Sequence, residues 1–109
     1  MMDEQEFRTQ SDLALTALYN LLASASDEHD FDPDMNNGAL AIEFEDPPAK
    51  FVISPNAPVR QIWVSAHSRS FKLDWDAARA EFVMPTGGQT LKELIEQQIE
   101  LRTGKKIAL

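Results

Sequence analysis

The chain has 109 residues, carries a formal net charge of -8 and contains no cysteine. Its length favours a single domain spanning residues 1–109. Without thiols the chain cannot form disulfides, thiolate zinc sites or an iron-sulfur cluster ligated by its own residues. No apolar run reaches the length of a membrane-spanning helix, and residues 1–6 are acidic where a presequence would be basic, so we expect a soluble, cytoplasmic protein.

The charge is polarised along the chain. Residues 1–49 carry twelve acids and one base, a net of -11, whereas residues 50–109 carry six acids and nine bases, a net of +3. An acidic half favours metal cations or a basic protein partner, and it disfavours nucleic acid, whose phosphates bind basic surfaces. A surface that serves only solubility is the alternative.

The first predicted element is a helix over residues 3–24. Asp3 is followed three residues later by Glu6, as in a capping box, and Phe7, Leu18 and Leu22 recur at helical spacing. We expect this helix to fray in residues 23–26, where serines that favour caps and turns accumulate.

An acidic stretch follows the helix, with five carboxylates in residues 27–34: Asp27, Glu28, Asp30, Asp32 and Asp34. In an extended segment successive side chains alternate, so Asp30, Asp32 and Asp34 would point to one side. The pair Asn37-Gly38 then favours a tight hairpin turn.

Clustered carboxylates without thiolates suit hard, oxygen-preferring cations such as ferric iron, manganese or calcium. Carboxylates this close together repel one another, and a bound cation relieves the repulsion, so metal binding is expected to stabilise the fold. His29 could add a nitrogen ligand, although a lone histidine in an acidic run is more commonly a solvated turn residue.

A calcium-binding EF-hand loop is a weaker interpretation of the same stretch. Asp32, Asp34 and Glu43 partly match its ligand spacing. The sequence Asp46-Pro47-Pro48 prevents the helix that must follow such a loop, so this interpretation is set aside.

Further strands are predicted over residues 39–45, 50–54, 61–65, 71–75 and 80–84. In the third of these, Ile62 and Val64 share the core side, which places Trp63 on the polar side with Gln61. Either a neighbouring strand's long side chains partly cover this tryptophan, or it is an anchor for a protein partner, as tryptophans often are.

A second helix is predicted to begin at the capping box formed by Thr90 and Glu93 and to end near Gly104. The order is therefore helix, five or six antiparallel strands, helix. The stable packing for two amphipathic helices is side by side on one face of the sheet, so we predict an α+β two-layer sandwich whose other face meets solvent or a partner.

This order of elements resembles the frataxin family, and within it the bacterial CyaY branch. The specific part of the resemblance is the run of residues 61–65, Gln-Ile-Trp-Val-Ser, with Pro58 upstream and Asp74-Trp75 downstream. The resemblance implies a monomeric protein of the bacterial cytosol that regulates iron-sulfur cluster assembly or donates iron to it, by binding a cysteine desulfurase and a scaffold protein. It implies ferrous or ferric iron weakly bound at the surface, with no haem and no cluster of its own.

The resemblance also assigns residues to two surfaces. The family's acids of the first helix and first strand form a ridge that binds iron and meets the desulfurase, here Asp27, Glu28, Asp30, Asp32 and Asp34, which we call the acidic ridge. The exposed sheet face, which binds partners, corresponds to Asn56, Gln61, Trp63 and Lys72. Family members commonly continue the ridge along the last turns of the first helix, and residues 19–24 are neutral here, so we expect a shortened ridge.

Two other functions are weighed. The first is an adaptor whose acidic surface docks a basic partner without any need for metal. The second is a ferroxidase, which would need carboxylate and histidine ligands converging on two irons, such as Glu-x-x-His pairs, and the sequence contains no such pair.

Overall fold

A computed structural model describes residues 2–45 and 47–109. Its elements, in chain order, are α1 (Glu4–His29), β1 (Asp32–Asn36), β2 (Ala39–Glu45), β3 (Pro48–Asn56), a short 3-10 helix η1 (Ala57–Val59), β4 (Gln61–Ala66), β5 (Arg69–Asp76), β6 (Glu81–Val83) and α2 (Leu91–Thr103). No helix in the described ranges is both long and apolar enough to cross a membrane.

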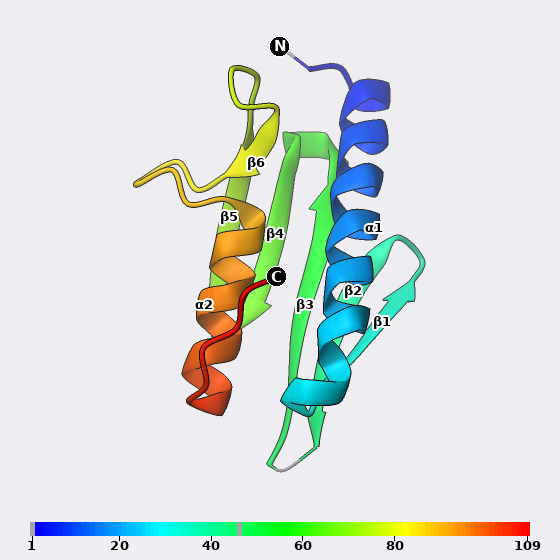
Figure 1. The fold of residues 1–109 in the computed structure, drawn as a ribbon. Coiled ribbons are helices and arrows are strands. Elements are labelled where there is room, and N and C mark those ends of the chain that lie inside the picture. Colours follow the sequence, from blue (N-terminus) through cyan, green and yellow to red (C-terminus); the bar gives the residue numbers. More distant parts are fainter. Residues whose placement is uncertain (1, 46) are drawn as a thin grey trace.

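The six strands form one antiparallel sheet in which each strand pairs with its neighbour in the sequence. Both helices lie on the same face of this sheet (Figure 1). The predicted α+β two-layer sandwich is confirmed, with six strands. No helix of residues 2–45 and 47–109 lies on the opposite face of the sheet, so the side chains of that face point away from the core.

The core lies between the helices and the covered face of the sheet. Alternate residues of β2, β3, β4 and β5 are buried there, and they meet the apolar stripes of the two helices. The largest fully buried side chains come from α1, from the sheet and from α2: Phe7, Leu15, Leu22, Leu40, Ile42, Phe51, Ile53, Ile62, Leu73, Leu94, Ile95 and Ile99. Burial of one face thereby decides which residues of each strand face outward.

Two tight turns set the register of the β1–β2 and β4–β5 hairpins. Asn37 and Gly38 have φ angles of 53° and 81° and join Asn36 to Ala39, so the predicted two-residue turn is confirmed. The β4–β5 turn is also only two residues long, His67 and Ser68, with φ angles of 53° and 61°. The predicted strand over residues 71–75 therefore begins too late, because Arg69 and Ser70 already belong to β5.

The predicted end of the first helix is wrong. α1 continues to His29, and Asp30 follows as its C-cap with a φ of 54°. The hydroxyls of Ser24 and Ser26 donate to the carbonyls of Asn20 and Ala23 within the helix, so these serines do not end it. Asp46, part of the predicted break after β2, lies outside the described residues, and Pro48 already pairs with Glu45.

The capping box at the start of α2 is confirmed. The Thr90 hydroxyl accepts a hydrogen bond from the Glu93 backbone N–H at 3.2 Å, and the Glu93 carboxylate accepts one from the Thr90 N–H at 3.0 Å. These bonds to Thr90 hold the pKa of the Glu93 carboxyl below its ordinary value of 4.5. A carboxyl whose pKa is lowered by folding stabilises the fold above its unfolded pKa, and this contribution is lost as the pH falls through the folded pKa.

Replacing Glu93 with Gln should therefore reduce the free energy of unfolding at neutral pH, because the charged member of the capping box is lost. The difference from the parent protein should shrink as the pH falls below about 4.5, where the carboxyl itself becomes protonated. Urea denaturation between pH 3 and pH 7 would measure it. Glu100→Gln removes a carboxylate far from the cap and should not reproduce the loss, and an equal loss at every pH would contradict the proposed role of the charge.

Candidate functional site

The five residues of the acidic ridge come from three local settings. Asp27 and Glu28 lie in the last turn of α1, Asp30 caps the helix, and Asp32 and Asp34 lie on β1. All five side chains are exposed. The predicted single row of Asp30, Asp32 and Asp34 is therefore wrong, because the left-handed backbone at Asp30 takes it out of the strand, while Asp32 and Asp34 do share the outward side.

Because α1 extends to His29, the acidic ridge begins within the last turn of the helix, and only the turns just before it lack acidic residues. Residues 19–24 lie one to three turns before the end of α1, and the end itself is acidic through Asp27 and Glu28. The ridge thus runs from the last turn of the helix, through its C-cap, onto the edge strand β1. It lacks only the contribution of the preceding turns.

Two further carboxylates adjoin the ridge, and their place beside it was not predicted. Glu43 lies directly opposite Asp32 in the β1–β2 pairing, and Glu45 lies two residues further along the same strand. A two-residue turn at Asn37-Gly38 dictates the pairing of Asp32 with Glu43, so the sequence contained enough information to find this contact. Lys50 on β3 balances part of the added charge, with its Nζ 3.9 Å from a Glu43 oxygen.

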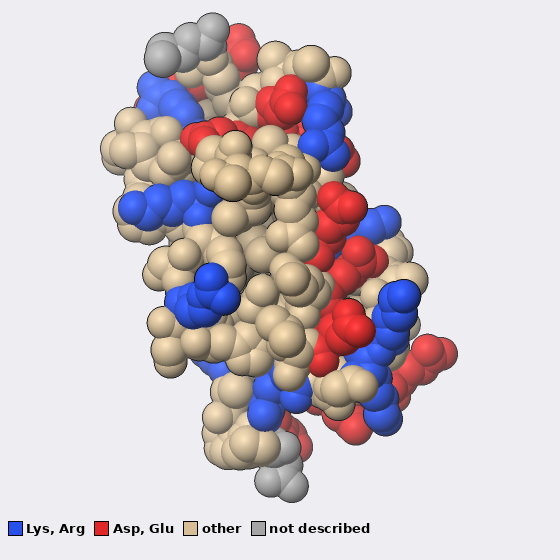
Figure 2. All heavy atoms as spheres, turned by 90° about the vertical axis from the view of Figure 1, so that its left-hand side faces the viewer, with Lys and Arg blue, Asp and Glu red and all other residues tan. Residues whose placement is uncertain are grey.

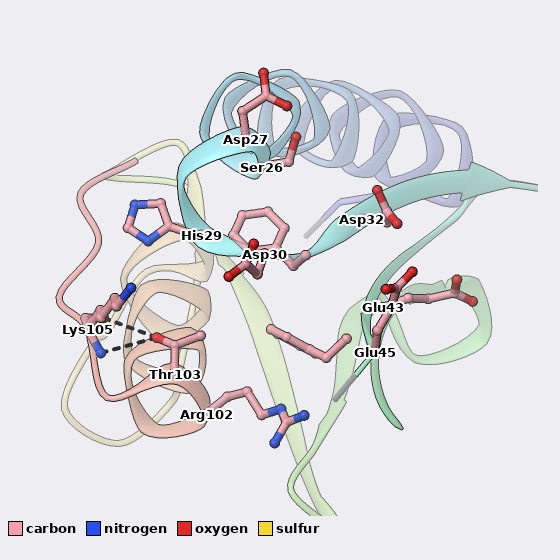
Figure 3. A pocket seen from close by; sticks show the side chains of 12 residues that line it. Ser26, Asp27, His29, Asp30, Asp32, Glu43, Glu45, Arg102, Thr103 and Lys105 are labelled. Atoms are coloured by element: carbon pink, nitrogen blue, oxygen red, sulfur yellow. Dashed lines mark hydrogen bonds between the residues drawn. The ribbon is translucent and has the colours of Figure 1, made fainter. Parts of the chain in front are cut away.

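A cavity of about 670 Å³ opens at this end of the molecule, between the ends of the two helices and the edge of the sheet. Figure 3 shows Asp32, Glu43 and Glu45 together on the strand side, and Arg102 and Lys105 on the α2 side. Asp27 and Asp30 also line the cavity. Five carboxylates thus surround one open space, with two cationic side chains across from them.

Within residues 2–45 and 47–109, no group of three or more His, Asp or Glu side chains is close enough together to hold a metal ion. His29 is half-buried beside Phe31, with the two rings stacked at 6.3 Å between centroids. The carboxylates present suit a hard cation in ligand type, but binding at short distance would require their exposed side chains to reorient. The arrangement as it stands attracts hydrated cations or a basic surface through long-range charge.

The EF-hand interpretation fails in the structure as it did in the sequence. Asp32 and Asp34 lie on β1 and Glu43 lies on β2, so the candidate ligands belong to a hairpin instead of a loop between helices.

The exposed sheet face lies on β3, β4 and β5. Trp63 is 38% exposed while its neighbours Ile62 and Val64 are buried, so the predicted outward position of the tryptophan is confirmed. The pairings bring Asn56 opposite Gln61 and Trp63 opposite Lys72. The four predicted residues therefore form one contiguous patch.

Side chains in this patch are ordered by specific contacts. The Lys72 ammonium lies 4.9 Å from the centroid of the Trp63 ring. The Trp63 indole N–H donates to the Gln61 carbonyl oxygen at 3.0 Å, and the Gln61 amide donates to an Asp74 carboxylate oxygen at 3.0 Å. Asp74 was not among the predicted site residues, because its contact with Gln61 depends on the length of the β4–β5 turn.

Charges on the side of the molecule that carries α2 and the β5–β6 edge are mixed. In Figure 2 acidic side chains gather in one column, and basic side chains lie on both sides of it. This side has no single dominant sign, in contrast to the acidic ridge. This side therefore differs in charge from the acidic ridge, whose five residues are all carboxylates.

Comparison with known proteins gives consistent matches. The family model described as a frataxin-like domain matches residues 1–105. The iron-sulfur cluster assembly protein CyaY of Pseudomonas entomophila is 31% identical over 108 residues, covering 97% of this chain and 94% of that protein. A protein of the same name from Azotobacter vinelandii is 29% identical over 83 residues, or 74% of each chain.

Solved structures agree on the fold. Frataxin from Psychromonas ingrahamii superposes with a TM-score of 0.76 at 21% identity, covering 97% of this chain and 96% of that one. Yeast frataxin gives a TM-score of 0.69 at 22% identity, covering 88% and 79%. Together with the family model and the relatives of nearly equal length, these matches show that the chain belongs to the frataxin-like family.

Proposed function

We propose that the protein acts in iron-sulfur cluster assembly as a non-catalytic, iron-binding regulator. Support for the process comes from the relatives, which bear the name iron-sulfur cluster assembly protein CyaY. In this proposal a cysteine desulfurase docks on the acidic ridge and a scaffold protein docks on the exposed sheet face. The protein works as a monomer in the bacterial cytosol, and it carries ferrous or ferric iron as cargo.

The iron-binding part of this proposal rests on one observation, the cavity bordered by five carboxylates. Oxygen ligands without thiolates suit iron as a hard cation, and side chains that must reorient to reach the ion favour weak, reversible binding. Weak binding fits a protein that hands iron on or senses its level, because a tight site would retain the ion.

The same surface suits a basic docking partner. Exposed charges of one sign accelerate encounter with the opposite sign, and they do so in a salt-dependent way. A metal-independent adaptor is therefore the second candidate function. It is favoured by the lack of a preformed three-ligand group in the described residues.

Iron should stabilise the folded protein if the ridge binds it. At free ferrous iron ten times above the dissociation constant, the free energy of unfolding should rise by about 1.4 kcal/mol. Thermal midpoints under anaerobic conditions, with and without ferrous iron, would measure the shift. Replacing Asp30, Asp32 and Asp34 with Asn should abolish most of it, because the charge is lost with little change in size.

The matched control removes three carboxylates from the opposite end of α1, as Glu4→Gln, Glu6→Gln and Asp12→Asn. It changes the net charge by the same amount and should keep the iron response and desulfurase binding. An unshifted midpoint for the parent protein would favour the adaptor. Desulfurase binding that survives the three Asn substitutions would show that the ridge is not the docking surface in either candidate function.

Trp63→Ala should weaken scaffold binding at least tenfold, because an exposed tryptophan held in place by its neighbours is a typical interface hot spot. The fold should survive, since the side chain lies outside the core. Isothermal calorimetry with the scaffold protein would measure the affinity. Leu13→Ala, which truncates a 59% exposed side chain on α1, is the control, and equal losses for both variants would argue against this face.

A further inference from the structure

A chain of hydrogen bonds runs across the exposed sheet face from β5 to β4. Asp74 accepts from the Gln61 side-chain amide, and Gln61 accepts from the Trp63 indole N–H, each at 3.0 Å. Asp74 and Gln61 face one another directly in the strand pairing, while Gln61 and Trp63 are two residues apart on the same side of β4. The three side chains are therefore aligned by the sheet itself.

The chemistry of the three groups permits only one direction for this chain. An indole N–H can only donate, so Gln61 must present its carbonyl oxygen to Trp63. A carboxylate can only accept, so Gln61 must present its amino group to Asp74. The orientation of the Gln61 amide thus follows from its two partners, because a flipped amide would turn its NH2 group toward the indole N–H and its oxygen toward the Asp74 carboxylate.

Lys72 acts on the same indole from the other neighbouring position. It is the direct cross-strand partner of Trp63, and its ammonium lies 4.9 Å from the ring centroid. The ring of Trp63 is therefore restrained at its edge by Gln61 and over its face by Lys72. An exposed aromatic side chain without such contacts would exchange among rotamers and would lose that freedom on binding.

We propose that Asp74 is a positioning residue for the partner-binding face, acting through Gln61 to hold the Trp63 indole in the orientation that binds. This inference rests on the proposed role of Trp63 in scaffold binding. Because Gln61 already satisfies the indole N–H, the scaffold has no need to supply an acceptor there and meets the apolar part of the ring. Preorganisation of one such side chain corresponds to about two- to tenfold in affinity.

Two substitutions at Asp74 separate the hydrogen bond from the charge. Asp74→Asn keeps an oxygen that accepts from Gln61, whereas Asp74→Ala removes the acceptor, and both remove the same negative charge. In the free protein, Asp74→Ala should accelerate solvent exchange of the Trp63 indole proton, observed by nitrogen-proton NMR and assigned with a Trp63→Phe variant. Asp74→Asn should leave this exchange near the parent rate.

A second test reverses the direction of the hydrogen bond between positions 61 and 74 and keeps the indole N–H as a donor to position 61. Gln61→Glu should loosen Trp63, because two carboxylates then face one another and repel. Adding Asp74→Asn should restore slow exchange. The amide introduced at position 74 can donate to one oxygen of the carboxylate introduced at position 61, while the other oxygen of that carboxylate still accepts from the Trp63 indole. Such rescue depends on the hydrogen bonds and cannot come from a general loss of stability.

Scaffold affinity, measured for the same variants, decides whether the orientation matters for binding. Asp74→Ala should bind the scaffold about two- to tenfold more weakly, and Asp74→Asn should bind near the parent level. Unchanged indole exchange in Asp74→Ala would overturn the positioning role, and altered exchange with unchanged affinity would overturn its link to binding. If Trp63→Ala itself leaves scaffold binding intact, the proposed function of this face fails, while indole exchange still tests the positioning of Trp63.

Discussion

Burial of one face of the antiparallel sheet is the constraint on which the other features depend. Because side chains alternate along a strand, the burial of Ile62 and Val64 under the helices forces Gln61 and Trp63 outward. A slip of one residue in any strand would exchange the two sets and expose the core. The outward direction of these side chains therefore follows from the burial of the opposite face and does not require contacts on the open face.

Local rules predicted much of this fold from the sequence. Alternation identified the covered and open sides of β4, Asn37-Gly38 marked a two-residue turn, and Thr90 with Glu93 marked the start of α2. Each of these depends on nearby residues alone. The candidate partner-binding residues Asn56, Gln61, Trp63 and Lys72 could be named from the resemblance, and the strand pairing shows that they are contiguous.

Features that depend on distant contacts or unusual backbone were not predictable in this way. Ser24 and Ser26 suggested the end of α1, but the helix continues to His29, Ala25 packs against the core, and the serines bond within the helix. In the turn at His67-Ser68 both residues have a positive φ although neither is glycine. The turn therefore lacks the glycine-containing pair that usually indicates a two-residue hairpin turn in a sequence. Without that length the contact between Gln61 and Asp74 could not be placed.

The end of α1 has a further electrostatic consequence. Aligned peptide groups give the C-terminus of a helix a partial negative charge, which stabilises lysine and arginine there and opposes carboxylates. This helix instead ends in Asp27, Glu28 and Asp30, each at the unfavourable pole, at a cost of about 0.3–1 kcal/mol per exposed charge. A cation or basic side chain placed at this helix end would be attracted by the unpaired carbonyls of the last turn as well as by the carboxylates, and it would reduce this unfavourable electrostatic energy.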